Sequence, residues 1–434
     1  MKKYIIFLLI FNLFLVSCSK EENIPDPQNE QPDQQPTDPD PDGESEPPTP
    51  VTYFTFRDNN PFREDTNGLY ILIHDDQGTL LDYKAYENEV TLNFESTETI
   101  SEKLSVTVIK RNVDNLGNTA YELTTTQAVQ NGSEWILEPS GFSDYPTPGN
   151  TGNFFTATIN GVPRVNGFWR TNTIFELGGG ASSTTYAGGI TDMTIDLGLY
   201  EEYSDYYITI LDGTNQLKYL RHSYDGTNIV VDYEELEDPV AQYEVNLPEN
   251  HSFYWLEVAG FPEDIPYHDY YGGLLQRSIT GLNPDVPTQP LVFGYPSGFE
   301  RFRTVLSTRW DNKAYLRIQY GPALNGLNIP NPSFVIENPL RNRFLINTDV
   351  PYETARNTWR FDAGDMNDGT YIGTIWHTDV PSASPNIVGD LPQEILDALP
   401  ELEIEELEYS HTTLKFSLEG GETLSRNELT IYNY

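Results

Sequence analysis

Short runs of apolar residues recur along the chain from about residue 51 onward, and turn-forming residues separate them. Residues 68–78 (GLYILIHDDQG) run into an Asp-Gln-Gly turn, after which the apolar pattern resumes in TLLDYKAY. Residues 206–224 (YYITILDGTNQLKYLRHSY) repeat this arrangement around Asp212 and Gly213. Apolar stretches on both sides of such a turn are typical of β-hairpins. Both segments therefore predict paired antiparallel strands.

Other segments have the length and composition of single strands, namely EVTLNFES, KLSVTVIK, NIVVDYEEL and KAYLRIQYG. A short helix is predicted only within residues 391–409 (LPQEILDALPELEIEELEY), where Pro400 would end it. The 28 tyrosines and 21 phenylalanines, with many Gly, Asn, Asp and Thr residues, also favour sheets joined by tight turns. We therefore expect an all-β fold.

A tryptophan motif repeats within the folded part. WILEPSGF (residues 135–142) returns as WLEVAGF (residues 255–261), and a weaker copy, WRFDAGD, covers residues 359–365. Repeated β-rich units of about 100 residues have the size of a β-sandwich. We expect Trp135, Trp255 and Trp359 to pack between the sheets of successive units. The predicted architecture is tandem immunoglobulin-like β-sandwiches at residues 51–148, 149–265 and 266–370, followed by a C-terminal β unit at 371–434.

The first residues have the pattern of a secretory signal. Two lysines precede an apolar stretch that ends in LVSC, and Cys18 is the only cysteine of the chain. LVSC resembles a bacterial lipobox, which implies cleavage after residue 17 and a diacylglycerol on the sulfur of Cys18. A lone thiol cannot form an internal disulfide, which agrees with an anchoring role. The alternative is an ordinary signal peptide, residues 1–17, followed by a chance cysteine.

Residues 18–50 are rich in Pro, Asp and Glu and have too few apolar side chains to build a core, so we expect a disordered linker. In polyproline II geometry some 30 residues could extend up to about 100 Å. The sequence CSKEE, which begins at Cys18, resembles the export signal that sends lipoproteins of Bacteroidota to the outer face of the outer membrane. The alternative is that these charges only begin the linker and that the protein faces the periplasm.

The chain is strongly acidic, with 25 basic and 66 acidic residues and a formal net charge of −41. Nucleic acid and anionic membrane surfaces would be repelled by such a protein, so neither is an expected partner. Neutral ligands, cations and basic partners remain.

Sequence motifs give no support to an enzyme. No nucleophile elbow, phosphate-binding loop, zinc-binding helix or dinucleotide fingerprint is present. His268 and His377 each lie near an aspartate, but we expect both histidines in surface loops, with no catalytic dyad. Because acids are so numerous, the presence of carboxylates alone cannot identify a hydrolase.

One acidic segment is a calcium candidate. DAGDMNDGTY offers Asp362, Asp365 and Asp368, with Asn367 between them, as oxygen ligands around glycines. No other cofactor is expected. The alternative is a set of ordinary Asp-Gly turns, which use the same residue types for local backbone hydrogen bonds.

Aromatic residues next to polar ones are the candidate ligand-binding residues. These are Trp169, Trp310 and Trp376, together with Tyr267, Tyr270 and Tyr271 in the segment IPYHDYYGG. A sugar ring can stack on an exposed aromatic plane while neighbouring polar side chains bind its hydroxyls. The alternative is that these rings fill the sandwich cores or brace the domains.

The organisation of the whole chain resembles surface lipoproteins of Bacteroidota, in particular the all-β class that captures glycans with tandem immunoglobulin-like domains. At the level of motifs the resemblance is limited to LVSC and SKEE. It implies a lipid-anchored protein on the outer membrane that binds polysaccharide. A structural or adhesive protein with a protein partner is the second hypothesis, and a polysaccharide-degrading enzyme is the third.

Overall fold

The computed structural model describes residues 48–59, 69–87, 89–137, 149–163, 165–172, 191–200, 204–261, 273–279, 290–382, 384–418 and 425–433. The chain divides between Thr49 and Pro50, and residues from Pro50 to Tyr434 form one compact unit. The predicted signal peptide, Cys18 and the linker up to residue 47 lie outside the described residues.

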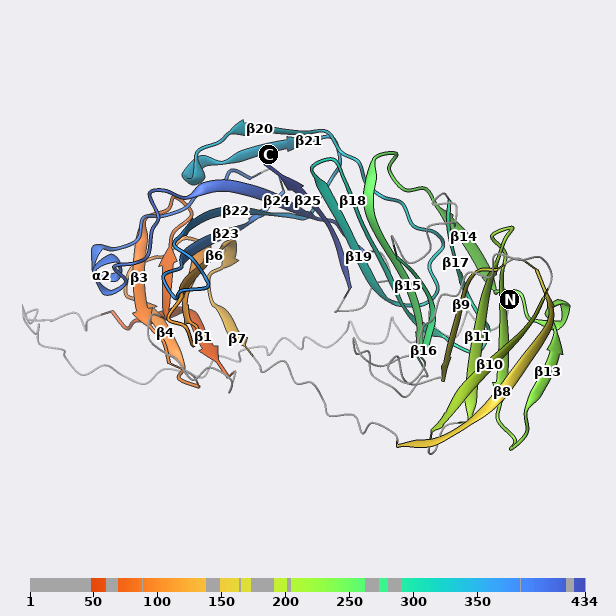
Figure 1. The fold of residues 1–434 in the computed structure, drawn as a ribbon. Helices are drawn as coiled ribbons and strands as arrows, with labels where there is room; N and C mark the ends of the chain where they lie inside the picture. The colour runs from red at the N-terminus through yellow and green to blue at the C-terminus, as the bar shows by residue number, and fades with distance from the viewer. Residues whose placement is uncertain are drawn as a thin grey trace, which may run out of the picture. The chain divides into compact units, whose positions relative to one another are not determined.

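The described chain is all-β, as predicted, with about 61% of residues in strands and several sheets. The largest sheet has twelve strands (Figure 1). In spatial order they are β16 (Gly273–Ile279), β15 (His251–Phe261), β18 (Arg301–Trp310), β19 (Lys313–Gly321), β25 (Arg426–Tyr432), β24 (Glu408–Lys415), β22 (Thr354–Ala363), β23 (Ile372–Pro381), β6 (Thr119–Gln130), β5 (Lys103–Val113), β2 (Tyr70–His74) and β3 (Leu80–Ala85).

Smaller sheets accompany it. Three of them have three strands each: β4 (Leu92–Ser96), β1 (Val51–Asp58) and β7 (Ser133–Leu137) form the first, β10 (Thr191–Tyr200), β8 (Asn150–Val162) and β13 (Ile229–Asp232) the second, and β12 (Leu217–Ser223), β11 (Asp205–Asp212) and β9 (Val165–Asn172) the third. Two have two strands each, namely β14 (Ala241–Val245) with β17 (Leu291–Tyr295), and β20 (Phe334–Asn338) with β21 (Leu345–Thr348).

The two predicted hairpins are confirmed. Strands β2 and β3 pair around a turn in which a carboxylate oxygen of Asp75 accepts hydrogen bonds from the backbone of Gln77 and Thr79. Strands β11 and β12 pair in the same way around Asp212, whose carboxylate binds the backbone N–H of Gln216. The predicted helix is α2 (Gln393–Ala398), and Pro400 follows its end. Two short 3-10 turns cover Tyr233–Glu235 and Arg341–Arg343.

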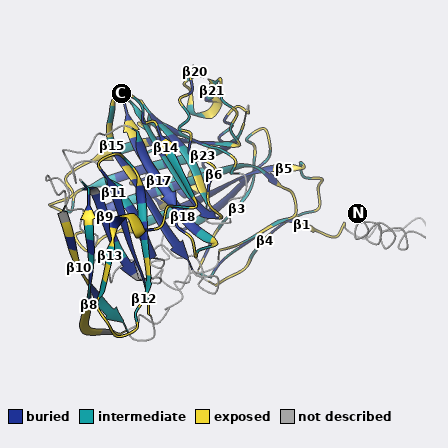
Figure 2. Cartoon of the chain, turned by 90° about the vertical axis from the view of Figure 1, so that its right-hand side faces the viewer, coloured by how far each residue is buried: buried dark blue, intermediate teal, exposed yellow. Residues whose placement is uncertain are grey.

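Three of the apolar cores in the described part of the chain lie between stacked sheets. The first joins β1 and β4 to β2 and β5 through residues such as Phe54 and Ile71. The second joins the β8 and β11 sheets through residues such as Ile159 and Ile208. In Figure 2 the buried stretches lie within the strands, while exposed residues gather mostly at turns. Each core thus fills a two-layer sandwich.

The third and largest core covers one face of the twelve-stranded sheet. Its members include Leu306 of β18, Leu429 of β25 and Trp359 of β22, which pack with Phe293 of β17 and with Phe344. Farther along the same face, side chains of β6 and β23 pack against residues of α2 and its flanking segments. We call this side of the sheet the covered face.

The predicted domain boundaries at residues 265 and 370 do not separate independent sheets. Strands β15 and β16 pair across the first boundary, and β22 and β23 pair across the second. In addition β6, from the predicted first unit, pairs in parallel with β23. The first two cores do lie within residues 51–148 and 149–265, but the strands of residues 371–434 belong to the large sheet.

Candidate functional site

The side of the large sheet opposite the covered face carries polar residues. On β22, Arg356 and Thr358 alternate with the core residues Ala355 and Trp359. Successive side chains of a strand point to opposite faces, so this alternation separates a polar face from the covered one. The polar face includes Phe253, Trp255 and Glu257 of β15, Ser307 and Arg309 of β18, Glu428 and Thr430 of β25, Thr413 and Lys415 of β24, Arg356 and Thr358 of β22, His377 and Asp379 of β23, and Glu122, Thr124 and Thr126 of β6. The apolar Val305, Ala314, Leu316 and Ile318 of β18 and β19 lie on the same face.

Strand register places many of these residues in a line across the sheet. One row of paired positions crosses eight neighbouring strands, from β15 to β6. Its members are Phe253, Arg309, Ala314, Thr430, Thr413, Arg356, Asp379 and Thr126. Neighbouring strands lie about 4.8 Å apart, so the row is roughly 33 Å long. Most of its side chains can donate or accept hydrogen bonds.

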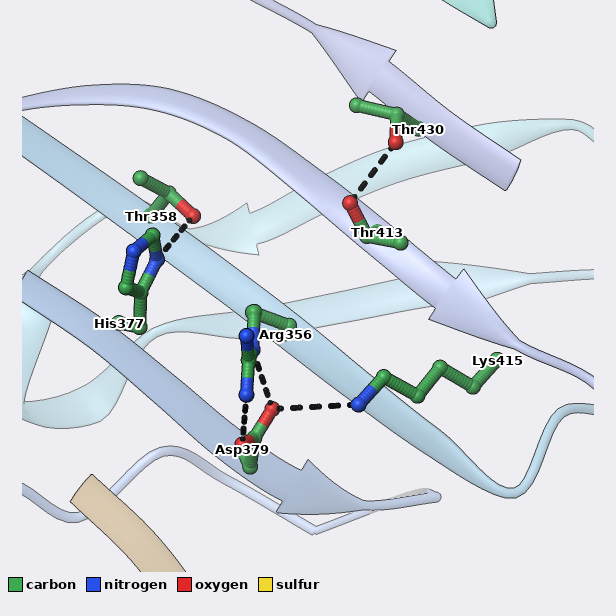
Figure 3. Close-up of polar contacts among 7 residues, drawn as sticks. All are labelled: Arg356, Thr358, His377, Asp379, Thr413, Lys415 and Thr430. Atoms are coloured by element: carbon green, nitrogen blue, oxygen red, sulfur yellow. Dashed lines mark hydrogen bonds and ion pairs between the residues drawn. The ribbon is translucent and has the colours of Figure 1, made fainter. Parts of the chain in front are cut away.

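A charged cluster lies in the middle of this row (Figure 3). Arg356 Nε and Nη2 donate to the two carboxylate oxygens of Asp379 at 2.8 and 2.6 Å, and Lys415 Nζ lies 3.9 Å from Oδ1. Burial opposes ionisation of Asp379, but the hydrogen bonds from Arg356 outweigh it and hold the pKa of this carboxyl below its usual value. Asp379 is therefore ionised at neutral pH and is not available as a general acid.

His377 lies next to this cluster. Its Nδ1 is 3.0 Å from Thr358 Oγ1, and a second hydroxyl pair, Thr413 and Thr430, lies 2.8 Å apart (Figure 3). The prediction that His377 is a surface loop residue is wrong. It is a half-buried residue of β23, and because Asp379 follows two positions later, both side chains lie on the same face. His268 lies outside the described residues.

The histidines of this face predict a pH effect on stability. Burial, and then the positive charge of Arg356, lower the pKa of His377, while Glu122 and Asp379 oppose the shift. Burial, and then His377, lower the pKa of His411 on β24. A histidine that stays neutral when folded but takes up a proton when unfolded destabilises the fold as the pH falls below about 6.5.

We therefore expect His377→Gln to reduce the loss of stability between pH 7.5 and pH 5. The measurement is the free energy of unfolding by urea at both pH values. Protonation elsewhere also relieves the repulsion within this acidic chain, so the informative quantity is the difference between the variant and the wild type. An identical pH dependence in the two proteins would contradict the assignment.

An exposed tryptophan lies at the β15 end of the polar face. Trp255 is 37% exposed, although tandem sandwiches would have buried it. Its Nε1–H points to Glu257 Oε2 at 3.3 Å, and the Arg277 guanidinium carbon lies 5.7 Å from the ring centre. Arg309 belongs to β18, which pairs with β15 along the edge opposite β16. Its guanidinium lies 5.9 Å from the ring centre of the half-buried Phe253. Two aromatic rings, each beside an arginine, therefore share one face of one strand.

The buried residue Glu257 holds the arginines at this end of the polar face in place. The residue is only 1% exposed, and its Oε2 accepts a hydrogen bond from Arg277 Nε at 2.8 Å. Its Oε1 accepts one from Arg303 Nη2, and Arg303 is itself buried. The carboxylate thus fixes the two arginines and the indole in one hydrogen-bonded network.

The tryptophans proposed as exposed binding residues are buried. Trp169 and Trp310 are each 3% exposed and Trp376 is 1% exposed. Each occupies a position that points into a core, and the Trp376 Nε1–H donates to Thr125 Oγ1 at 2.9 Å. The prediction that they form exposed platforms is therefore wrong. The alternation of β18 and β23 turns Trp310 and Trp376 inward, and β9 is covered on both faces, with Phe168 in one core and Trp169 in another. Tyr267, Tyr270 and Tyr271 lie outside the described residues.

The calcium candidates are engaged in local contacts. Asp362 pairs with Arg360, Asp365 accepts from the backbone of Asn367, and Asp368 accepts from the backbone of Thr370. Among the described residues no group of three acidic, histidine or cysteine side chains is arranged to hold a metal. Asp365 and Asp368 therefore accept hydrogen bonds in local turns, Asp362 is a residue of β22, and the three carboxylates do not converge.

The repeated tryptophans do not have equivalent environments. Trp359 is buried at 2% exposure in the covered face, as expected. Trp135 lies on β7 and packs edge-on against Phe54 at 5.4 Å. The prediction of a sandwich-core position is wrong for Trp255. The signal that could have identified it is the alternation in HSFYWLEV, where Tyr254 and Leu256 point to the core and Trp255 does not.

Comparisons with known proteins do not identify the chain: no protein-family model matches it, and no curated protein matches it significantly. Among the described residues, no helix is long and apolar enough to span a bilayer.

Proposed function

We propose that this chain is a surface lipoprotein that binds a polysaccharide along the polar face of the twelve-stranded sheet. The observation that carries the proposal is the exposed Trp255, which lies on β15 two residues from Phe253, the first member of the row of hydrogen-bonding side chains. Trp255 offers an apolar plane on which a sugar ring can stack. Hydroxyls of Thr413 and Thr430, and the charged pair Arg356–Asp379, can bind sugar hydroxyls farther along.

The length and rigidity of the row suit an extended polymer. A site about 33 Å long takes several sugar units, and a sheet holds its side chains in fixed positions. Asp379 is held ionised by Arg356, which suits hydrogen-bond acceptance and not proton donation. We therefore propose binding without catalysis.

Trp255→Ala tests the proposal. We expect this variant to lose about 2 kcal/mol of binding free energy, or roughly thirtyfold in affinity, because an exposed aromatic anchor is removed. The measurement is retardation in native gels that contain each of a panel of polysaccharides. Phe154→Ala is the matched control, since Phe154 is 64% exposed but lies on β8 in another sheet. Equal retardation of the two variants by every polysaccharide that retards the wild type would contradict the site.

The anchor is tested separately. We propose that Cys18 carries lipid and that the folded part is displayed outside the outer membrane. Cys18→Ser is expected to move the protein from the membrane fraction to the soluble fraction, because the acyl chains supply most of the membrane affinity. The mass of the N-terminal peptide checks the modification directly, and an unacylated Cys18 in the mature wild type would contradict it. Digestion by a protease added to intact cells distinguishes outward from periplasmic display.

A further inference from the structure

The polar face differs in charge from the chain as a whole. The whole chain has 25 basic and 66 acidic residues. On the polar face between β16 and β6, basic residues are at least as frequent as acidic ones. The basic residues are Arg277, Arg301, Arg303, Arg309, Arg356, Arg360, Lys415 and Arg426, and the acidic residues are Glu122, Glu257, Asp362, Asp379, Glu408 and Glu428. The excess of acidic over basic residues in the whole chain is therefore absent from this face.

Arg309 is the exposed arginine at the β15 end of this face. It is exposed, and its row neighbours on β15 and β19 are Phe253 and Ala314, neither of which is charged. Within the described part of the chain it forms no ion pair, and its guanidinium lies over the Phe253 ring. Arg277, in contrast, is paired with the buried Glu257.

Aromatic planes and a guanidinium that can still bind an anion occur together here. Phe253 and Trp255 lie two residues apart on the same face of β15, so their rings are neighbours. A guanidinium binds a carboxylate through two parallel hydrogen bonds, and an aromatic plane accepts the apolar face of a sugar ring. A sugar that carries its own carboxylate satisfies both groups at once.

We infer that the ligand is an anionic polysaccharide built from uronic acid units, with a uronate ring on Trp255 or Phe253 and its carboxylate on Arg309. This inference rests on the proposed function and specifies its ligand. The negative charge of the rest of the chain repels polyanions at long range, so the attraction is confined to this face. Binding of a polyanion is therefore specific to the polar face, where arginines take the place of acidic residues.

The test uses the full chain and paired polymers that differ only in charge. Polygalacturonate, alginate and hyaluronan are each compared with the methyl-esterified form of the same polymer, and neutral dextran and dextran sulfate complete the panel. We expect at least one uronate polymer to bind about tenfold more tightly than its esterified form. Arg309→Gln should remove most of that preference. Arg221→Gln, which changes an exposed arginine of β12 in another sheet, should leave it unchanged.

The outcomes distinguish this inference from the proposed function. If neutral or esterified polymers bind as tightly as the uronates, or bind alone, the ligand class is wrong while polysaccharide binding stands. If dextran sulfate binds as well as the best uronate, the site responds to charge alone and the stacked uronate is wrong. If Arg309→Gln keeps the full preference, the assignment of Arg309 is wrong. If no polymer binds, the proposed function itself fails.

Discussion

Replacing Glu257 by glutamine is expected to lower the free energy of unfolding by about 3–5 kcal/mol, the range found when one partner of a buried ion pair is removed. The wild-type carboxylate is 1% exposed and accepts hydrogen bonds from both Arg277 and Arg303. Glutamine keeps the shape of the side chain but has no charge. Its N–H₂ group faces one of the guanidinium groups, which cannot accept a hydrogen bond. Without the carboxylate, Arg277 and Arg303 lose their shared counter-ion.

Urea unfolding of Glu257→Gln and of a matched control measures this effect. Asp205→Asn also removes a carboxylate beside an arginine, but the Asp205–Arg221 pair is partly solvent-exposed and 3.5 Å long. Exposed pairs contribute at most about 1 kcal/mol, so the control should remain close to the wild type. If the two variants are equally stable, Glu257 does not organise a buried network.

Trp359→Ala is expected to cost about 3–5 kcal/mol of stability, because it leaves a large cavity in the main core. Trp359 is 2% exposed, and its ring packs at 5.2 Å against Phe344 and at 6.0 Å against Tyr409, both nearly edge-on. The motif WLEVAGF places Trp255 at the corresponding position of the repeat. Since Trp255 is 37% exposed, Trp255→Ala should cost no more than about half as much.

The same unfolding measurement compares the two tryptophan variants. Equal losses of stability would mean that both residues lie in sandwich cores, as the sequence repeat predicts. A large loss for Trp359→Ala with a small one for Trp255→Ala would agree with their placement on opposite faces of the large sheet. The comparison also establishes that Trp255→Ala is folded, which the binding experiment requires.

Local structure could be predicted because local residues determine it. The turn at Asp75 forms through hydrogen bonds to Gln77 and Thr79, two and four residues away. The helix at Gln393–Ala398 ends before Pro400, which cannot continue it. The residues that define the turn and the end of the helix are close together in the chain, and both features were correctly predicted, although the helix itself also packs against the large sheet through Ile395.

The continuous sheet and the site could not be predicted in this way. The parallel pairing of β6 with β23 joins residues about 250 positions apart, and no local pattern indicates it. Whether a tryptophan of an alternating strand is buried or exposed depends on which face the other segments cover. Trp376, which was predicted to be exposed, is therefore buried, and Trp255, which was predicted to be buried, is exposed. The sequence does indicate that His377 and Asp379 share one face, because residues two positions apart on a strand point to the same side.

The most direct test of the central claim is a footprint of the bound polysaccharide on the protein. Hydroxyl-radical oxidation, followed by mass spectrometry, measures the reaction rate of Trp255 with and without a polymer that retards the protein. The rate at Phe154, which is exposed on a different sheet, provides the internal reference. Binding along the polar face predicts slower oxidation of Trp255 and an unchanged rate at Phe154. Unchanged oxidation of Trp255 under conditions in which the polymer is bound would contradict the account.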